Sequence, residues 1–181
     1  TVDLSIFAEI WSNGTDRLPA AANPDQEEVH RQRWREAVSR IEDPDLAAYG
    51  DAVATATGGN DQAGAALLSA IFGNSAFLSQ CLISDLPFAR RLLEDGPDAA
   101  FDDALAAVAD RTALADETTD QLKHRLRVAK RRAALAIGAA DIANVWPLEQ
   151  VTGALSDFAC ASLQASCRHL LRALHDSGEL A

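Results

Sequence analysis

The sequence predicts an all-α protein, a multi-helix bundle in which two long C-terminal helices form an antiparallel hairpin. Apolar residues make up 48% of the chain and are rich in Ala and Leu, whereas aromatic residues make up only 6%. This composition favours helix over sheet. The apolar residues also recur every three or four positions, the period of an α-helix, and no segment alternates like a strand. Breaks at Gly and Pro divide the chain into about eight helical stretches, as in a bundle.

Residues 1–25 are predicted to form an N-terminal arm, and residues 26–181 a helical domain. The arm is expected to be a short helix or extended segment followed by a loop. Asn23 and Pro24 mark the start of the first helix, because Pro is favoured at the first helical position. This helix is expected to run to about Ile41. Its buried side is predicted to carry Val29, Trp34 and Val38.

Turn and cap residues mark the boundaries of the next helices. Asp43-Pro44 begins a helix that is expected to end near Thr57, and Gly58-Gly59-Asn60 separates it from an apolar helix over 62–72. Gly73-Asn74-Ser75 interrupts the pattern before it resumes at Phe77. Ser84-Asp85 is predicted to cap a helix through Leu93.

The helical pattern breaks once more at Gly96-Pro97, before a short helix over 99–108. The first long C-terminal helix then begins at a capping box, in which Thr118 is followed three residues later by Gln121. It is expected to reach about Ala143. Its apolar residues form one stripe at helical spacing: Leu122, Leu126, Ala129, Ala133, Ile137 and Ala140.

The last helix is predicted to start at Pro147 and to end near Gly178. Its apolar residues continue at helical spacing through the whole stretch: Leu148, Val151, Leu155, Ala159, Leu163, Cys167, Leu170 and Leu174. Cys160 and Cys167 are two turns apart on this helix. With Cys81 they are interpreted as small buried apolar residues, because their spacing fits no metal site and three is an odd number for a disulfide framework.

The charge of the chain excludes several classes of partner. The formal net charge is −11 and the isoelectric point is near 4.6, so we expect binding to neither nucleic acid nor an anionic membrane surface. No apolar run approaches the roughly 20 residues of a membrane span, and no signal peptide opens the sequence. A reducing cytoplasm is therefore the expected location.

A basic run in the first long C-terminal helix is the main candidate for a binding surface. Between residues 122 and 132 there are six cations and no acid, which leaves −17 for the rest of the chain. At 100° per residue, one face beside the apolar stripe carries Lys123, Arg127, Lys130 and Arg131. Arg125 and Arg132 lie on the other side of the stripe.

Two interpretations of this basic run remain open. It could be a docking surface for an anionic ligand or an acidic partner. It could instead be structural and pair with the acidic residues that precede it, which the balance of charge favours: Glu94, Asp95, Asp98, Asp102, Asp103, Asp110, Asp116, Glu117 and Asp120. Asp141 lies within an apolar stretch of the same helix. If it is buried it needs a partner, and an arginine of the run is the natural candidate.

Other polar residues are interpreted as structural. Asn74 and Ser75 could hold an anion at a helix start, although a simple cap is the more common arrangement. Asp43 and Asp45 resemble a metal-binding carboxylate pair, but the intervening proline favours a helix cap. The four histidines form no metal-binding pair and are expected to be surface or satisfied polar residues. No residue is assigned a catalytic, cofactor-binding or metal-binding role.

Two regions, 71–93 and 122–174, resemble the N-terminal part of the bifunctional glutamine synthetase adenylyltransferase/adenylyl-removing enzyme of bacteria. The matching pieces of this sequence are Ile71-Phe-Gly-Asn-Ser-Ala-Phe-Leu78, Leu126-Arg-Val-Ala-Lys-Arg-Arg-Ala-Ala-Leu-Ala-Ile137, Ala140-Asp141-Ile142, Val145-Trp-Pro-Leu-Glu-Gln-Val-Thr152 and Ala154-Leu-Ser-Asp-Phe-Ala159. The chain departs from the family pattern at Ala76, where Pro is usual, and at Cys160, where Asp is usual. Because the pieces occur in the family's order and spacing, they are more specific together than any piece alone.

The resemblance implies that the helical domain is a fragment of a larger multidomain enzyme. That enzyme attaches AMP to a tyrosine of glutamine synthetase and removes it by phosphorolysis, with PII signal protein and glutamine setting the balance. Mg²⁺ and ATP or AMP are expected for the parent enzyme, whose nucleotidyltransferase core holds the metal with an Asp-x-Asp pair. Asp43 and Asp45 precede the matching pieces, so they are not that pair, and the fragment is expected to be non-catalytic and free of cofactors.

Two functions are therefore compatible with the sequence. The first is a scaffold or docking region of the adenylyl-removing half. The alternative is a stand-alone helical adaptor that binds a protein partner through the basic face and has no enzymatic activity. A piece of a larger enzyme is expected to leave part of the last helix's apolar stripe uncovered, whereas a stand-alone adaptor is not.

Overall fold

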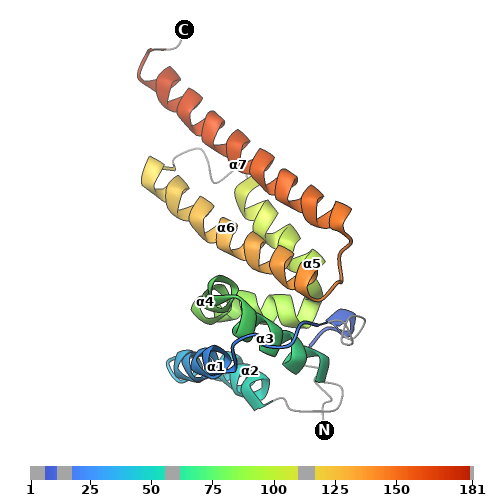
Figure 1. Ribbon diagram of the computed structural model, residues 1–181. Coiled ribbons are helices and arrows are strands. Elements are labelled where there is room, and N and C mark those ends of the chain that lie inside the picture. Colours follow the sequence, from blue (N-terminus) through green and yellow to red (C-terminus); the bar gives the residue numbers. More distant parts are fainter. Residues whose placement is uncertain (1–6, 12–17, 56–61, 110–116, 180–181) are drawn as a thin grey trace.

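The computed structural model describes residues 7–11, 18–55, 62–109 and 117–179, and within them the fold is all-α, as predicted (Figure 1). The described residues form seven helices and no strand: α1 (Pro24–Val38), α2 (Pro44–Thr55), α3 (Gln62–Asn74), α4 (Ala76–Ser84), α5 (Leu86–Ala109), α6 (Thr119–Ile142) and α7 (Leu148–Asp176). None of these helices is both long enough and apolar enough to span a bilayer. The Gly58-Gly59-Asn60 break lies outside the described residues.

The helices form two groups that share α5. Helices α1 to α4 pack together with the first part of α5, and the second part of α5 packs with α6 and α7 (Figure 1). Helix α4 also crosses α6 closely. A Cβ atom on Gly138 of α6 would lie only 2.8 Å from Cδ1 of Leu78, so this crossing depends on the absence of a side chain at Gly138. One continuous core of buried residues runs through both groups.

Helix α1 begins as predicted but buries a different residue set. The Asn23 side chain accepts a hydrogen bond from Gln26 N, and Pro24 follows at the first helical position. Trp34 and Val38 are buried, whereas Val29 is 48% exposed, so the prediction for Val29 is wrong. His30 is buried instead, because it lies four residues before Trp34 on the same stripe.

The predicted break at Gly96-Pro97 is confirmed as a sharp kink inside α5. Gly96 has φ 87° and ψ 175°, which are not helical values, and the helix continues on the other side in a new direction (Figure 1). In a regular helix the carbonyl of Leu93 would accept a hydrogen bond from the N–H of residue 97. Residue 97 is proline and has no N–H, so the Leu93 carbonyl is left free at the kink.

The N-terminal segment supplies hydrogen-bond donors to the Leu93 carbonyl at the kink. Leu93 O accepts hydrogen bonds from Ala8 N at 2.6 Å and from the indole Nε1 of Trp11 at 3.0 Å. Phe7 and Trp11 are almost fully buried, with exposed fractions of 3% and 1%. The described part of the N-terminal segment therefore belongs to the core and supplies the donors that the interrupted helix lacks.

Helix α6 follows its predicted design. Thr118 and Gln121 form the capping box, with Gln121 N donating to Thr118 Oγ1 and Thr118 N donating to Gln121 Oε1. Most of the predicted stripe is buried, with Leu126 partly so. The helix ends at Ile142, and Asn144, with a φ of 52°, turns the chain back toward α7. Trp146 stabilises this corner, since its ring packs edge-on against the ring of Phe101, with 5.8 Å between the ring centroids.

Helix α7 packs on both α5 and α6 and projects beyond them at its C-terminal end (Figure 1). A hairpin of α6 and α7 as a separate unit stays a prediction, because α5 shares the contact. Only Val151, Ala154 and Ala165 of α7 are buried. Cys160 and Cys167 are exposed, so the prediction that they are buried is wrong; only Cys81 lies inside. The exposed large apolar residues of α7 are Leu148, Leu155, Leu163, Leu170, Leu171 and Leu174.

We predict that Gly96→Ala destabilises the chain by about 1–2 kcal/mol, because an L side chain is strained at positive φ and the Cβ would lie 3.2 Å from Ile10 Cγ2. Urea unfolding followed by circular dichroism measures the change. The control is Gly153→Ala in α7, where nothing lies within 4 Å of the new Cβ. That control should stabilise the chain by about 0.5–1 kcal/mol through its helix propensity. Equal stability changes for the two variants would contradict the role of the kink.

Candidate docking surface

The basic residues of α6 divide into a paired group and an exposed group. Arg125 belongs to the paired group, and its guanidinium makes a two-pronged contact with Glu117, with Nε–Oε1 and Nη2–Oε2 distances of 2.8 Å. Its Nη1 also donates to the carbonyls of Ala107 and Val108. These carbonyls lie in the last turn of α5, where backbone carbonyls have no N–H partner within the helix. A cationic side chain there can donate hydrogen bonds to them.

The pairing with Arg125 shifts the titration of Glu117. Hydrogen bonds from the Arg125 guanidinium lower the pKa of the Glu117 carboxyl; burial opposes this, and the positive charge of Arg125 adds to the lowering. The Glu117 side chain is only 8% exposed. Glu117 therefore stays ionised and, with Arg125, holds the start of α6 against the end of α5.

Arg132 is the second paired cation. Its Nε and Nη2 donate to the two carboxylate oxygens of Asp85 at 2.7 and 3.2 Å, and its guanidinium lies 5.2 Å from the centre of the Phe88 ring. Asp85 also accepts a hydrogen bond from Phe88 N, which caps the start of α5 as predicted. One side chain, Asp85, thus ties the α4–α5 corner to α6.

The described acidic residues before α6 do not cover its basic face. Of that stretch, Glu117 meets Arg125, and Asp120 makes only an exposed 3.5 Å contact with Lys123. Four of the described acids of α5 have other partners: Glu94 pairs with Arg90, Asp95 and Asp103 pair with Arg91, and Asp98 accepts from Trp146 and Gln150. The fifth, Asp102, is exposed. Asp110 and Asp116 lie outside the described residues. Within the part of the chain that the structure describes, the structural interpretation therefore holds for Arg125 and Arg132.

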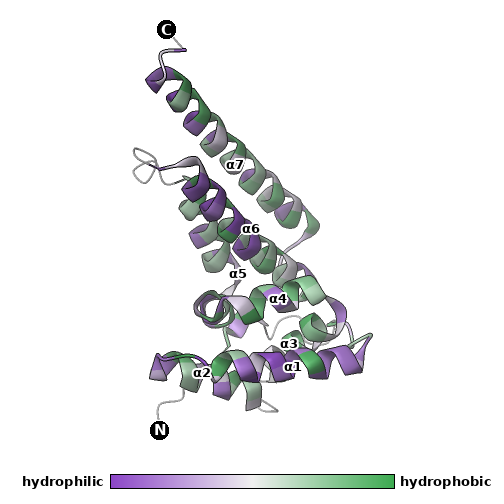
Figure 2. Cartoon of the chain, turned by 90° about the vertical axis from the view of Figure 1, so that its left-hand side faces the viewer, coloured by the Kyte–Doolittle hydropathy of each residue, from purple (hydrophilic) through white to green (hydrophobic). Residues whose placement is uncertain are grey.

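The exposed group consists of Arg127, Lys130 and Arg131. All three are exposed, and none forms an ion pair within the part of the chain that the structure describes. They line an open hollow of about 490 Å³. Figure 2 shows hydrophilic residues concentrated on the N-terminal half of α6. This hollow, completed by Phe77, His124 and Val128, is called the basic hollow below.

The basic hollow joins apolar and charged groups. Phe77, at the start of α4, is 55% exposed, and Val128 of α6 is half-buried beside it. Cys81 of α4 is buried. Burial raises the pKa of its thiol, and the charge of Arg131 only partly offsets that rise. Cys81 is therefore held as a neutral thiol, which argues against a role as a nucleophile.

Asp141 does not meet the condition set for an ion pair with an arginine of the basic run, which was that its carboxylate is buried. Its side chain is exposed, while the neighbouring Ala139 and Ala140 are buried. At 100° per residue, Asp141 points away from the core although apolar residues surround it in sequence. Its carboxylate is solvated and does not require an arginine.

Asn74 and Ser75 act on the backbone. Ser75 caps α4, with Leu78 N donating to its Oγ at 3.3 Å. Asn74 accepts from Ala22 N and donates to Ala20 O and Ala70 O, so it fastens the N-terminal segment to α3. An anion site at Asn74 and Ser75 stays a prediction, and these bonds account for both side chains without one.

The other polar candidates also have structural roles. Asp43 Oδ1 accepts from the backbone N–H groups of Asp45 and Leu46, which confirms the cap. The buried His30 is satisfied by a 2.8 Å contact between its Nδ1 and Phe72 O. Among the described residues, no group of three His, Cys, Asp or Glu side chains is placed to hold a metal ion.

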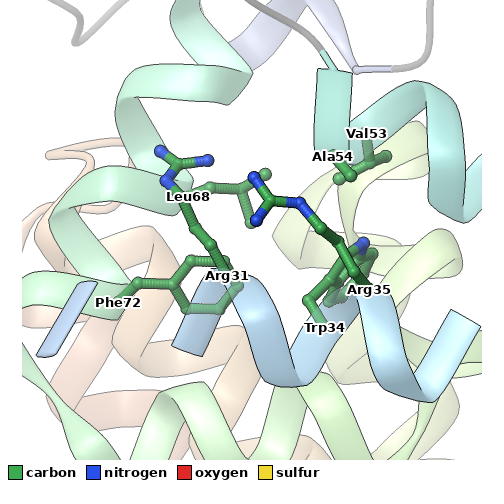
Figure 3. Close-up of a pocket in the computed structure, with 7 residues that line it drawn as sticks. All are labelled: Arg31, Trp34, Arg35, Val53, Ala54, Leu68 and Phe72. Carbon is green, nitrogen blue, oxygen red and sulfur yellow. The ribbon is translucent and has the colours of Figure 1, made fainter. Parts of the chain in front are cut away.

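A second hollow lies between α1, α2 and α3 (Figure 3). Arg31 and Arg35 lie above its apolar floor, which includes Trp34 and Phe72. Arg31 is engaged by Glu27 and Arg35 by Glu28. The hollow has a volume of only about 10 Å³, roughly that needed for one water molecule, so it does not accommodate a substrate.

A third hollow of about 300 Å³ lies where α5 meets α7. Asp98, Asp102 and Asp157 line it together with Trp146 and Gln150. Asp98 already accepts hydrogen bonds from the Trp146 and Gln150 side chains, so one of the three carboxylates is committed to the corner between α6 and α7. The basic hollow is thus the larger opening, and its cations have no ion-pair partner among the described residues.

Comparison with known proteins places this arrangement in a family. Residues 65–179 match the family described as glutamate-ammonia ligase adenylyltransferase, and this range covers more than half of the chain. The chain belongs to the glutamate-ammonia ligase adenylyltransferase family. The matched range includes most of α3 and all of α4 to α7, and with them the basic hollow, the kink in α5 and the exposed side of α7. Helices α1 and α2 lie outside it.

Curated relatives agree with this assignment. A bifunctional glutamine synthetase adenylyltransferase/adenylyl-removing enzyme of Bradyrhizobium sp. (strain ORS 278) is 36% identical over 115 residues, which cover 64% of this chain and 12% of the relative. Enzymes of the same name from Rhodopseudomonas palustris (strain HaA2) and Bradyrhizobium diazoefficiens are 37% and 41% identical over 105 and 90 residues. Those matches cover 58% and 50% of this chain but only 10% and 9% of the relatives. No solved structure matches the chain.

We predict that Glu117→Gln destabilises the chain by about 2 kcal/mol at pH 7, because the Arg125 guanidinium then loses its charged partner. The pKa of Glu117 is lower in the folded chain than in the unfolded chain. Its stabilisation is therefore present above the unfolded value, about 4.3, and is lost as the pH falls through the folded value.

Urea unfolding between pH 3 and pH 7 tests this prediction, and the difference between native chain and variant should shrink toward acid pH. Glu42→Gln is the control, since Glu42 is exposed and forms no ion pair among the described residues. A Glu117→Gln difference that stays constant with pH would contradict the role assigned to the ionised carboxylate.

Proposed function

We propose that this chain is a non-catalytic helical part of the adenylyl-removing half of a glutamine synthetase adenylyltransferase. The activity of such an enzyme is to add AMP to a tyrosine of glutamine synthetase and to remove it by phosphorolysis. Glutamine synthetase and PII signal protein would then be partners of the whole enzyme. Mg²⁺ and ATP or AMP would bind its nucleotidyltransferase core. The role proposed for the helical part is to brace that core.

The exposed apolar side of α7 is the observation that carries this proposal. Leu163 is 69% exposed, Leu170 is 59% exposed and Leu174 is 37% exposed. Burying a leucine side chain stabilises a protein by about 1.5–3 kcal/mol, so a row of exposed leucines is more typical of a contact surface than of a solvated face. The chain also corresponds to only 9–12% of its relatives' length, which supports a further part of the enzyme as the partner.

The spacing on α7 fits packing against another element. Cys160, Leu163, Cys167, Leu170 and Leu174 follow intervals of three, four, three and four, the pattern of the apolar seam of a coiled coil. All five are exposed. The seam continues past the part of α7 that packs on α5 and α6, so its occupant must come from outside the described residues.

The chemistry of phosphoryl transfer also supports a non-catalytic role. A nucleotidyltransferase core needs a carboxylate pair that is free to hold Mg²⁺. The Asp-x-Asp pair of this chain, Asp43 and Asp45, caps α2 and lies outside the residues that match the family.

A stand-alone adaptor is the alternative function. The exposed cations of the basic hollow favour it, because they provide a binding surface that needs no enzyme. The exposed seam of α7 argues against it, since an adaptor that works alone would leave these leucines in water.

A chimeric enzyme tests the bracing role. Residues 65–179 replace the matching segment of the Bradyrhizobium sp. enzyme, and release of AMP from adenylylated glutamine synthetase is measured with inorganic phosphate. We expect the chimera to be active, because the chain supplies support and not chemistry. Leu163→Glu together with Leu170→Glu should lower the activity and the melting temperature of the chimera, since the charges would be buried against the core.

The same pair of substitutions should leave the isolated chain almost unchanged, within about 0.5 kcal/mol, because both leucines are exposed there. Gln164→Glu is the matched control on the same helix, as Gln164 is exposed and is not part of the seam. A chimera that tolerates the leucine substitutions as well as Gln164→Glu would rule out the bracing role of α7.

A further inference from the structure

We propose that the basic hollow of α6 binds a short acidic peptide segment of a protein partner. An apolar side chain of that segment would sit against Phe77 and Val128, and its carboxylates would contact Arg127, Lys130 and Arg131. This site is separate from the seam of α7. The inference therefore holds whether or not the chain braces a nucleotidyltransferase core.

The charge of the hollow is the first argument. The chain has 27 acidic residues and 16 Lys or Arg residues, so a cluster of cations without acidic partners is unexpected in it. Six described arginines do form ion pairs with acidic side chains, including the two paired arginines of α6. Arg127, Lys130 and Arg131 have none among the described residues, although they lie within five consecutive positions. A partner's carboxylates would supply the missing charge, and arginine binds carboxylates with a two-pronged geometry.

The apolar part of the hollow is the second argument. Phe77 is 55% exposed at a place where α4 and α6 meet, and it shares the opening with Val128. A volume of about 490 Å³ lies in the range of small-ligand sites, so the hollow has room for a few side chains of a peptide. An aromatic anchor with charges around it is the usual arrangement of the energetically important centre of a protein interface.

The charge of the surroundings selects a short ligand over an extended polyanion. The patch covers residues 123–131, about 12 Å of helix. Outside residues 122–132 the chain has a net charge of −17, and at physiological salt this field is screened only beyond about 8 Å. A nucleic acid or an anionic bilayer would extend past the patch onto this negative surface. A short acidic peptide segment would fit within the patch and avoid that repulsion.

A second copy of this chain fits less well than another protein. Three of its five acidic residues on α5 already form ion pairs, with Arg90 holding Glu94 and Arg91 holding Asp95 and Asp103. A second copy would also bring a net charge of −11 toward a chain of the same charge. Self-association is therefore an outcome that the test must distinguish.

Fluorescence anisotropy with the native chain tests the inference. The probe is a fluorescein-labelled peptide with several glutamates around a central leucine, and the comparison peptide has glutamines in place of the glutamates. We expect only the acidic peptide to bind. Arg127→Glu with Arg131→Glu should weaken its binding by about tenfold or more, and Phe77→Ala by about fivefold. All three residues are exposed, so circular dichroism should show an unchanged fold.

Arg33→Glu with Arg40→Glu is the matched control. Both residues are exposed, form no ion pair among the described residues and lie in or near α1, far from the basic run in the sequence. This double variant changes the net charge by the same amount and should alter binding by less than twofold. Equal losses in the two double variants would mean that only overall charge matters, and would overturn the site.

Three other results would also overturn the proposal. The first is binding of the glutamine peptide as tightly as the glutamate peptide. The second is a single-stranded RNA oligomer that binds more tightly than the acidic peptide and displaces it. The third is a dimer in analytical ultracentrifugation that Arg127→Glu with Arg131→Glu abolishes, which would assign the hollow to a second copy. A chimeric enzyme that tolerates Leu163→Glu with Leu170→Glu, while the chain still binds the peptide, would reject the bracing role and leave this inference standing.

Discussion

The arrangement of the whole chain depends on one backbone carbonyl that has no partner in its own helix. Pro97 has no N–H, so the Leu93 carbonyl is free, and the positive φ of Gly96 turns the second half of α5 in a new direction. Ala8 and Trp11 then satisfy this carbonyl from the N-terminal segment. Because α5 is kinked there, it can pack with α1 to α4 through one half and with α6 and α7 through the other. The kink is thus what makes one core out of two groups of helices.

Helix α6 has a structural side and an open side. Arg125 and Arg132 both contact α5 or the residue that caps it. Arg125 donates to a carbonyl in the last turn of α5, and Arg132 pairs with Asp85 at its start. The remaining cations face outward, and Phe77 of α4 completes the hollow beside them. The same run of basic residues therefore stabilises the fold and also leaves a charged surface exposed. The face of α6 on which a side chain lies determines to which of the two groups it belongs.

Two surfaces of the chain remain uncovered, and they differ in chemistry. The seam of α7 is apolar and carries no charge at its five positions, so it suits permanent burial against another part of a larger protein. The basic hollow is charged and open, so it suits a partner that binds and leaves, with an affinity that depends on salt. A family member that both braces a core and receives a second protein would use both surfaces.

The sequence by itself determined the helices, their caps and the family. Helical periodicity, the Thr118–Gln121 capping box, the Asp43 cap and the break at Gly96-Pro97 are local properties, because each involves residues within four positions of one another. Residue order along the chain also carried the family resemblance. Tertiary structure decided which charges are paired and which apolar residues are buried. Asp85 meets Arg132 across 47 positions. Asp141 lies in an apolar stretch and Cys167 on the apolar stripe of α7, yet both are exposed. Periodicity places a residue on a face of a helix, but only the packing of the helices determines which faces are covered.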